Sequence, residues 1–332
     1  MKDTIFISGG AGYVGTVLTK KLLEKKYNVI VYDTFWFWDS PDSFVKKMNL
    51  QGQQNLRIIV GDIRDKELLN KSLKNIKTVI HLACISNDPS SDLNSDFTHS
   101  INYTGNINVI DEAKKAGVSN FIYASSSSVY GVKQVENVIE EMTLEPLTQY
   151  SKLKVEIEKY LLTQLDDKFR GVVIRPSTVC GYSPRQRLDV IVNILTNNAI
   201  NKNEITLFGG EQLRPNIHID DMTNLYLNLI EEDFSIINKK IYNAGWENLK
   251  VKQIASIVNN EIPSANITYH DTDDIRSYHV SSQKILNELG FKNKKTVRDA
   301  VIDLKYAFEH NLINSNDINC YNVKKIKEII RG

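Results

Sequence analysis

The chain is poor in residues that cross-link or interrupt a fold. Its 332 residues include only Cys84, Cys180 and Cys320, with no Cys-x-x-Cys pair. This spacing argues against a disulfide framework and a zinc ribbon, and the six scattered histidines form no ligand cluster, so we predict no metal site. A chain without disulfides indicates a reducing, cytoplasmic location. Seven prolines and 16 glycines are too few for collagen-like or low-complexity sequence.

Charge and hydropathy are also unbiased. Lys plus Arg number 41 and Asp plus Glu number 40, so the net charge is +1. This balance argues against nucleic-acid binding, for which a basic stripe is typical. No apolar run reaches the ~18 residues of a membrane span, and glycines interrupt the N-terminal stretch, so we expect neither a membrane protein nor a signal peptide. The basic, amphipathic tail at 324–331 favours a solvated closing helix.

Short apolar runs alternate with helical patterns through the first half of the chain. Such runs, buried on both faces, are typical of parallel βαβ units. We therefore predict an α/β fold: a Rossmann-type, doubly wound parallel sheet in residues 1–175, and a smaller, mixed substrate-binding subdomain in 176–332 from which the chain could return to the sheet. The expected strands of the large sheet are 4–8, 28–32, 56–60, 78–82, 120–124 and 171–174.

Three glycines follow the first expected strand. Gly9, Gly12 and Gly15 form a G-x-x-G-x-x-G pattern at a strand–turn–helix junction. A tight turn needs a residue without Cβ, and a diphosphate must approach the N–H groups at the helix N-terminus, where the helix dipole favours anions. The last glycine lets helix and strand pack closely. In this context the motif indicates a dinucleotide site rather than a plain glycine-rich turn.

Acidic residues end the next two expected strands. The Asp33 carboxylate can accept both ribose hydroxyls of an adenosine and would repel a 2′-phosphate. Residues 34–36 offer no cation to neutralise such a phosphate, which favours NAD over NADP. Asp62 could reach the adenine amino group, although a helix N-cap is an equally good explanation of Asp62 or Asp65.

Tyr150 and Lys154 are four residues apart on an expected helix and therefore share a face. Such pairs arise by chance among 15 tyrosines, and Tyr321 with Lys325 is a second one. Context distinguishes the first pair, because Ser126 lies just past the strand at 120–124, at the sheet edge where open α/β sheets bind ligands.

This trio suits the oxidation of an alcohol, which surrenders a hydride to nicotinamide and a proton to a base. A free tyrosine, with a pKa of ~10, is a poor base at neutral pH. The ammonium of Lys154 and the positive charge of oxidised nicotinamide favour its phenolate. Lys154 can also hold the nicotinamide ribose, and the Ser126 hydroxyl can donate to the substrate oxygen.

Together these motifs resemble the extended short-chain dehydrogenase/reductase family, specifically its nucleotide-sugar epimerase/dehydratase branch. The resemblance covers roughly residues 3–310. Besides the glycine loop, it rests on Asp33, 61–62, 81–83, Asn102, 125–131, 150–154, 175–176, 214–221 and Arg276.

The resemblance implies roles for individual residues. Oxidation falls to Ser126, Tyr150 and Lys154. The implied NAD ligands are Gly9, Gly12, Tyr13, Val14, Gly15, Asp33, Asp62, Ile63, Leu82, Ala83, Asn102, Tyr150 and Lys154. The implied contacts to a nucleotide-sugar substrate are Ser125, Thr178, Leu207, Phe208, Arg214 and Arg276.

The sequence departs from the family pattern at two places. Ser127 and Ser128 replace the Asp and Glu that perform acid/base elimination in sugar-nucleotide 4,6-dehydratases, which disfavours dehydration. Thr178 stands where the family commonly has Asn, so whether this position makes the family's usual diphosphate contact stays open. Arg185 and Arg187 could supply that charge to the substrate instead.

The expected reaction is NAD-dependent oxidation at C4 of a nucleotide-activated sugar. Reduction in place from the other face would give a 4-epimerase, which we favour. Release of the keto sugar would give a C4 dehydrogenase or ketoreductase, and residues 183–189 are similar to such enzymes acting on a GDP-heptose. A 4,6-dehydratase and a non-catalytic dinucleotide-binding protein are less favoured. Two amphipathic helices, about 102–116 and 147–162, predict a four-helix interface in a homodimer, as in the family.

Overall fold

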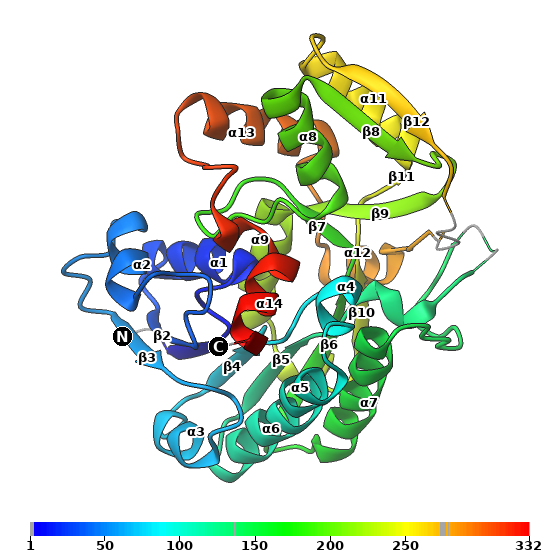
Figure 1. The fold of residues 1–332 in the computed structure, drawn as a ribbon. Coiled ribbons are helices and arrows are strands. Elements are labelled where there is room, and N and C mark those ends of the chain that lie inside the picture. The colour runs from blue at the N-terminus through cyan, green and yellow to red at the C-terminus, as the bar shows by residue number, and fades with distance from the viewer. Residues whose placement is uncertain (1–2, 134, 136, 273–276, 278, 332) are drawn as a thin grey trace.

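A seven-stranded parallel sheet forms the centre of the protein (Figure 1). The computed structural model describes residues 3–133, 135, 137–272, 277 and 279–331. The strand order is β10-β6-β5-β4-β1-β2-β3, so the direction of winding reverses between β1 and β4. The predicted Rossmann-type α/β fold is confirmed. The strands are β1 (Thr4–Ser8), β2 (Asn28–Asp33), β3 (Leu56–Val60), β4 (Thr78–His81), β5 (Asn120–Ala124), β6 (Arg170–Pro176) and β10 (Ile241–Ala244).

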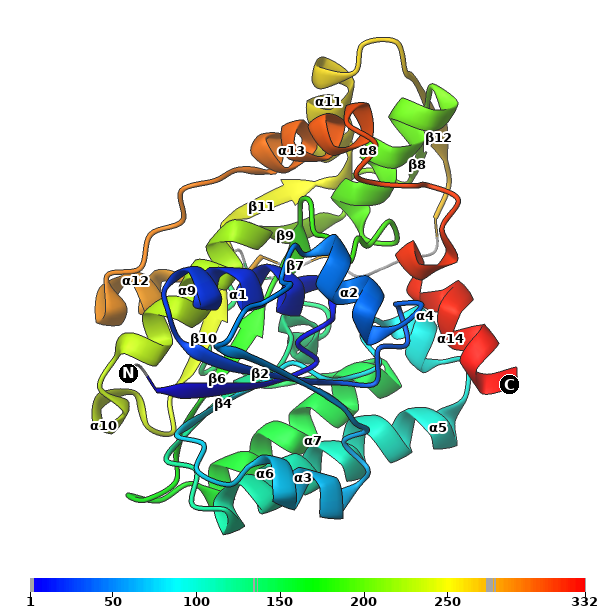
Figure 2. The ribbon, with the colours of Figure 1, turned by 90° about the vertical axis from the view of Figure 1, so that its left-hand side faces the viewer.

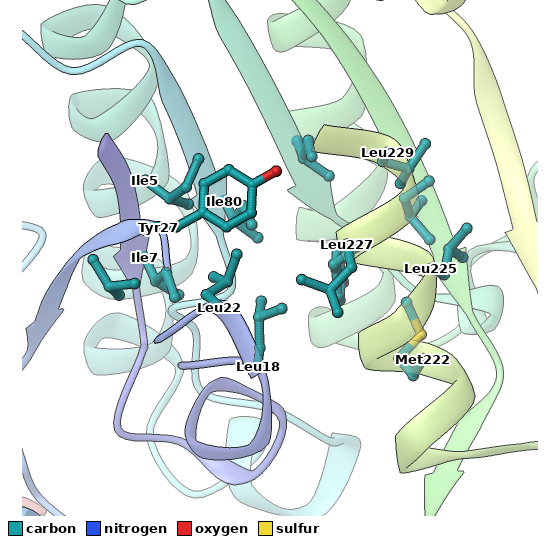
Figure 3. Packing of buried hydrophobic residues seen from close by; sticks show 14 of the residues in the cluster. Ile5, Ile7, Leu18, Leu22, Tyr27, Ile80, Met222, Leu225, Leu227 and Leu229 are labelled. Atoms are coloured by element: carbon teal, nitrogen blue, oxygen red, sulfur yellow. The ribbon is translucent and has the colours of Figure 1, made fainter. Parts of the chain in front are cut away.

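Helices cover both faces of this sheet, as Figure 2 shows. One face carries α1 (Tyr13–Glu24), α2 (Pro41–Lys47) and α9 (Ile219–Glu231). The other carries α3 (Lys66–Ser72), α6 (Asn106–Lys115) and α7 (Gln149–Gln164). In the core of the first face, Leu18 and Leu22 of α1 share a cluster with Ile5 and Ile7 of β1 and Met222 of α9 (Figure 3). In the described part of the chain, no helix has both the length and the apolar character that crossing a membrane requires.

Residues after β6 build a second, smaller unit. Its three-stranded sheet contains β7 (Thr178–Cys180), β9 (Leu213–His218) and β11 (Glu247–Lys250), and its two-stranded sheet contains β8 (Glu204–Phe208) and β12 (Asn266–His270). The helices α8 (Ile191–Lys202), α11 (Val251–Glu261) and α13 (Val297–Glu309) surround a separate core. In the same part of the chain, β10 and α9 return to the large sheet, accompanied by α10 (Phe234–Ile237) and α12 (Gln283–Leu289).

Helix α8 was not predicted from the sequence. Its residues, IVNILTNNAINK, are rich in asparagine and β-branched side chains, which have low helix propensity. Tertiary burial overrides that propensity, since Val192, Leu195 and Ala199 pack in the core of the second unit.

The chain ends beside the carboxyl edge of the large sheet. Helix α14 (Asn322–Arg331) lies next to α4 (Asp88–Ser91), as Figures 1 and 2 both show. Asn322 and Ile326 on its inner face are buried, whereas Lys324 and Lys327 are exposed. The tail is therefore amphipathic as expected, but its apolar face is docked on the protein. The remaining short helices are α5 (Ser95–His99), η1 (Ser100–Gly105), η2 (Ser127–Tyr130) and η3 (Ile318–Cys320).

A buried ion pair joins α7 to β6. The Nη2 atom of Arg175 lies 2.7 Å from Oε2 of Glu158, and both side chains are only 2% exposed. Arg175 also donates to the Tyr130 hydroxyl oxygen at 2.7 Å and to the Glu140 carbonyl oxygen at 3.1 Å. Glu158 accepts a further hydrogen bond from the Ser125 hydroxyl. Since burying each charge costs several kcal/mol, the pair depends on having both members and their hydrogen bonds in place.

Replacing Glu158 by Gln should leave the buried Arg175 guanidinium without its counter-charge. We expect the free energy of unfolding to fall by about 3–5 kcal/mol, measured by equilibrium denaturation in urea. Glu156→Gln, on the exposed face of the same helix, is the matched control and should change the free energy of unfolding by less than about 0.5 kcal/mol. A Glu158→Gln protein as stable as the wild type would contradict the role given to this pair.

Candidate active site

A cavity of about 510 Å³ lies at the carboxyl edge of the large sheet, where the strand order reverses. Doubly wound sheets bind their ligands at this position. Its walls come from the segments after β1, β2, β3, β4, β5 and β6, together with α7 and the second unit. The predicted site residues that line it are Gly9, Gly12, Tyr13, Val14, Gly15, Asp33, Asp62, Ile63, Leu82, Ala83, Ser125, Ser126, Tyr150, Lys154, Thr178, Arg185, Arg187 and Arg214.

The glycine loop between β1 and α1 leaves no room for side chains. A Cβ atom on Gly15 would lie 2.2 Å from the Gly9 carbonyl oxygen, and one on Gly9, whose φ is +77°, would lie 2.8 Å from the Ala83 nitrogen. Gly12 is the N-cap residue of α1, so no side chain caps the start of this helix. The backbone N–H groups at the start of α1 have no side-chain cap, and the tight glycine loop lets a ligand approach them. This arrangement suits a diphosphate, so the loop fits a dinucleotide.

Asp33 is held rigidly at the end of β2. One carboxylate oxygen accepts the Ala11 N–H at 3.0 Å and the other accepts the Phe35 N–H at 2.9 Å. Burial raises the pKa of Asp33, and these N–H groups oppose that effect. The carboxylate lines the cavity close to the glycine loop, where it can accept ribose hydroxyls.

The structure separates the two alternatives for the acids after β3. Asp65 is the N-cap of α3 and accepts the Leu68 N–H at 3.0 Å. Asp62 lines the cavity and pairs with Arg64, whose Nη2 lies 2.6 Å from its carboxylate. Asp62 therefore lies in the cavity wall, held by Arg64, and capping explains Asp65 alone.

The aromatic segment at 35–38 divides between the core and the cavity. Phe35 is buried in the core, whereas Trp36, Phe37 and Trp38 line the cavity. The Trp38 indole N–H donates to the Ala11 carbonyl oxygen at 2.8 Å. The indole thus ties this segment to the glycine loop and makes it part of the cavity wall.

The three predicted catalytic residues meet at one end of the cavity. The Lys154 ammonium lies 5.7 Å from the centroid of the Tyr150 ring and donates to the Ala124 carbonyl oxygen at 2.6 Å. Burial raises the pKa of Tyr150 well above its usual range, and the neighbouring Cys84 adds to this effect. A hydrogen bond with Ser126 and the charge of Arg187 oppose it. The phenol therefore holds its proton unless further positive charge arrives beside it.

Asn102 does not line the cavity. Its side-chain oxygen accepts the Ile85 N–H at 2.8 Å and its amide donates to the Ile85 carbonyl oxygen at 2.9 Å. Asn102 therefore holds the segment after β4, from which Cys84 and Ser86 reach the cavity.

The predicted nucleotide contacts on β8 also lie away from the cavity. Alternate side chains of a strand point to opposite faces. Leu207 points into the core of the second unit and is fully buried, whereas Phe208 is 59% exposed and stacks on His270. Arg276 lies outside the described residues.

Two predicted substrate contacts are already engaged by protein groups. The Ser125 hydroxyl donates to Glu158. The Arg187 Nε donates to an Asp189 carboxylate oxygen at 2.9 Å, while its Nη2 is buried without a hydrogen-bond partner. Arg187 is therefore oriented by Asp189 with one donor still available in the cavity wall.

Sequence reasoning missed several residues of the cavity wall. Cys84 follows β4, and its place after a predicted strand was a usable signal. Tyr226, Asn322 and Ile326 also line the cavity. They belong to α9 and α14, whose local pattern contains nothing that indicates this position.

His218, Asp220 and Asp303 come together at the start of α9. Lys295 lies 3.1 Å from Asp220 and 2.9 Å from Asp303, and Lys21 lies 3.0 Å from Asp220. Because ammonium groups already neutralise both carboxylates, we interpret this cluster as an ion-pair network that joins α1, α9 and α13.

Proteins similar in sequence include several UDP-glucose 4-epimerases and the human sterol-4-alpha-carboxylate 3-dehydrogenase. The chain is 28% identical to the putative UDP-glucose 4-epimerase of Methanocaldococcus jannaschii over 265 residues, which cover 78% of this chain and 82% of the relative. It is 27% identical to the UDP-glucose 4-epimerase of Yersinia enterocolitica, over 96% of this chain and 100% of the relative.

Solved structures share the fold over almost the whole chain. The UDP-glucose 4-epimerase of Thermotoga maritima with UDP-glucose has a TM-score of 0.82 at 24% identity, covering 93% of this chain and 100% of that one. MoeE5 in complex with UDP-glucuronic acid and NAD has a TM-score of 0.80 at 24% identity, covering 92% of this chain and 99% of that one. DesIV, a dTDP-glucose 4,6-dehydratase from Streptomyces venezuelae, has a TM-score of 0.82 at 21% identity, covering 93% and 98%.

The family model that matches the chain spans residues 5–245, from β1 to the end of β10. It therefore includes the glycine loop, Asp33, and the Ser126, Tyr150 and Lys154 trio. Since this match extends over most of the chain, the protein belongs to the NAD dependent epimerase/dehydratase family, and NAD is its cofactor.

Proposed function

We propose that the protein is a nucleotide-sugar 4-epimerase, which oxidises C4 of its substrate and reduces it again from the other face. The observation that carries the proposal is the meeting of Ser126, Tyr150 and Lys154 in the same cavity as the glycine loop and Asp33. The names of the relatives and the family membership support a nucleotide sugar as the substrate.

The protein's own groups manage the proton of the substrate hydroxyl. NAD, when bound, supplies the hydride chemistry and a positive charge at its nicotinamide. Tyr150 takes the proton from the C4 hydroxyl, and the Ser126 hydroxyl, which lines the same cavity, orients the substrate oxygen. Because burial alone keeps Tyr150 protonated, Lys154 and Arg187 are needed to favour its phenolate while the cofactor is oxidised.

Elimination of water is disfavoured by the groups beside Ser126. Ser127 is buried, and the Ser128 hydroxyl lies 2.9 Å from that of Ser126. Asp88 and Asp189 also line the cavity. Asp88 accepts a hydrogen bond from the Thr148 hydroxyl at 2.7 Å, and Asp189 forms an ion pair with Arg187. Both carboxylates are therefore engaged, and we do not assign them the acid and base roles of a 4,6-dehydratase.

For the substrate, we propose that Thr178 and Arg214 contact the nucleotide sugar from the second unit, since both line the cavity. The alternative function is a C4 dehydrogenase or ketoreductase, for example on a GDP-heptose, which would use the same trio and release the keto sugar. The two functions differ in whether a keto sugar and reduced cofactor accumulate.

That difference provides the first test. The protein is incubated with NAD and UDP-, GDP- or CDP-sugars, and products are followed by NMR together with NADH absorbance. An epimerase should convert one sugar nucleotide into its C4 epimer, approach equilibrium from both sides, and accumulate no NADH. Stoichiometric NADH with a 4-keto product would establish the dehydrogenase instead. Failure of every sugar nucleotide to bind or react would overturn the substrate assignment.

Tyr150→Phe tests the base directly. The variant should bind NADH with unchanged affinity, because the ring remains in place, and should lose about 10²-fold or more in turnover, the scale expected for a missing acid/base group. Tyr160→Phe, near the other end of α7, is the matched control and should retain its turnover. Full activity of Tyr150→Phe would remove this phenol from the mechanism.

We also propose a homodimer formed through α6 and α7, which pack against each other on one face of the sheet. Light scattering of the purified protein should give twice the monomer mass of 37.9 kDa. A monomer at micromolar concentration would refute this interface. The cytoplasmic location stays a prediction.

A further inference from the structure

Arg185 is a buried cation in the cavity wall with an unused donor. Its side chain is only 4% exposed, and its guanidinium carbon lies 3.6 Å from the centroid of the Phe37 ring. Its Nη2 donates to the Asn322 side-chain oxygen at 2.6 Å, whereas its Nε is buried without a hydrogen-bond partner. An unsatisfied charged donor in a buried position is costly, so this geometry indicates an anionic ligand.

The surroundings of Arg185 locate that ligand along the cavity. Phe37 belongs to the segment after Asp33, and Asp33 interacts electrostatically with Arg185. Arg187, by contrast, interacts with the catalytic Tyr150. Arg185 itself interacts with Arg187 as well as with Asp33, so it lies between the adenosine-ribose end of the cavity and the catalytic end. In a dinucleotide, the diphosphate lies between its two riboses.

We propose that Arg185 binds the diphosphate of the NAD cofactor and that Asn322, at the start of the C-terminal helix, is the positioning residue for this contact. The glycine loop offers N–H groups to the same diphosphate, and Arg185 adds a full positive charge from the second unit. This role differs from the contact to the substrate's own diphosphate that the sequence suggested.

Asn322 is suited to positioning because it ties two wall segments, the one with Ser86 and the one with Arg185 and Asp189, to α14. Besides accepting from Arg185, its side-chain amide donates to the Ser86 hydroxyl at 3.0 Å and to the Ser86 carbonyl oxygen at 3.3 Å. Its backbone N–H donates to Asp189 at 3.1 Å, and Asp189 orients Arg187. Ile326, one turn later, is buried and also lines the cavity.

Binding of ADP and of adenosine to protein stripped of nucleotide tests the contact with the diphosphate. For Arg185→Met, the affinity for ADP and NADH should fall about tenfold or more, whereas the affinity for adenosine should stay within about twofold, because only the charged contact is lost. Arg185→Lys should recover part of the loss. Arg298→Met, at an exposed arginine paired with Glu261, is the matched control and should bind all three ligands as the wild type does.

Asn322→Ala tests the positioning role. Because the guanidinium remains but loses its anchor, NADH should dissociate several-fold faster than from the wild type in stopped-flow fluorescence. Asn316→Ala, at an exposed asparagine of the same tail, should leave the dissociation rate unchanged. An unchanged rate in Asn322→Ala would overturn this role.

The cofactor and the sugar nucleotide both carry a diphosphate, so UDP is titrated separately into NAD-saturated protein. We expect Arg185→Met to leave UDP affinity unchanged. Weaker UDP binding with unaltered ADP binding would move Arg185 to the substrate, and a preserved preference for ADP over adenosine would overturn the proposal. None of these measurements requires turnover, so their outcome is independent of the proposed epimerase activity.

Discussion

The buried pair of Glu158 and Arg175 is the constraint on which the geometry of the active site depends. Glu158 lies one turn after Lys154 on α7, and Arg175 lies in β6. Together with the Lys154 bond to the Ala124 carbonyl oxygen, the pair fixes the helix against the carboxyl ends of β5 and β6. Tyr150 and Lys154 therefore reach the cavity from a helix that cannot slide without exposing a buried charge to an apolar environment.

The two halves of the chain contribute differently to the cavity. The large sheet supplies groups that follow directly from its topology, because Gly9, Asp33 and Ser126 all end parallel strands at one edge. The second unit and the tail supply cations and amides, including Arg187, Arg214 and Asn322. The proposed binding of an extended, anionic ligand between these parts would offset the desolvation cost of the buried arginines.

The features that the sequence predicted are those with local causes. Six strands, the glycine loop and the spacing of Tyr150 and Lys154 depend on patterns a few residues long, and all agree with the structure. Predictions that required knowledge of the tertiary environment did not agree with the structure. Helix α8 forms against its own propensity, the strand face places Leu207 in a core, and Asn102 supports Ile85 from outside the cavity. No local pattern could place Asn322 beside Arg185, 137 positions earlier in the chain.

The docking of α14 in the cavity wall also bears on how the protein can be recombined or fused. The N-terminus leads directly into β1, at the amino ends of the parallel strands, whereas the cavity lies at their carboxyl ends. An N-terminal fusion partner would therefore lie far from the ligands. An extension at the other terminus would emerge a helix away from bound nucleotide. Chimeras with relatives should exchange the loop carrying Arg185 and the final helix together. If only one of the two were exchanged, the hydrogen bond between Arg185 and Asn322 would be lost.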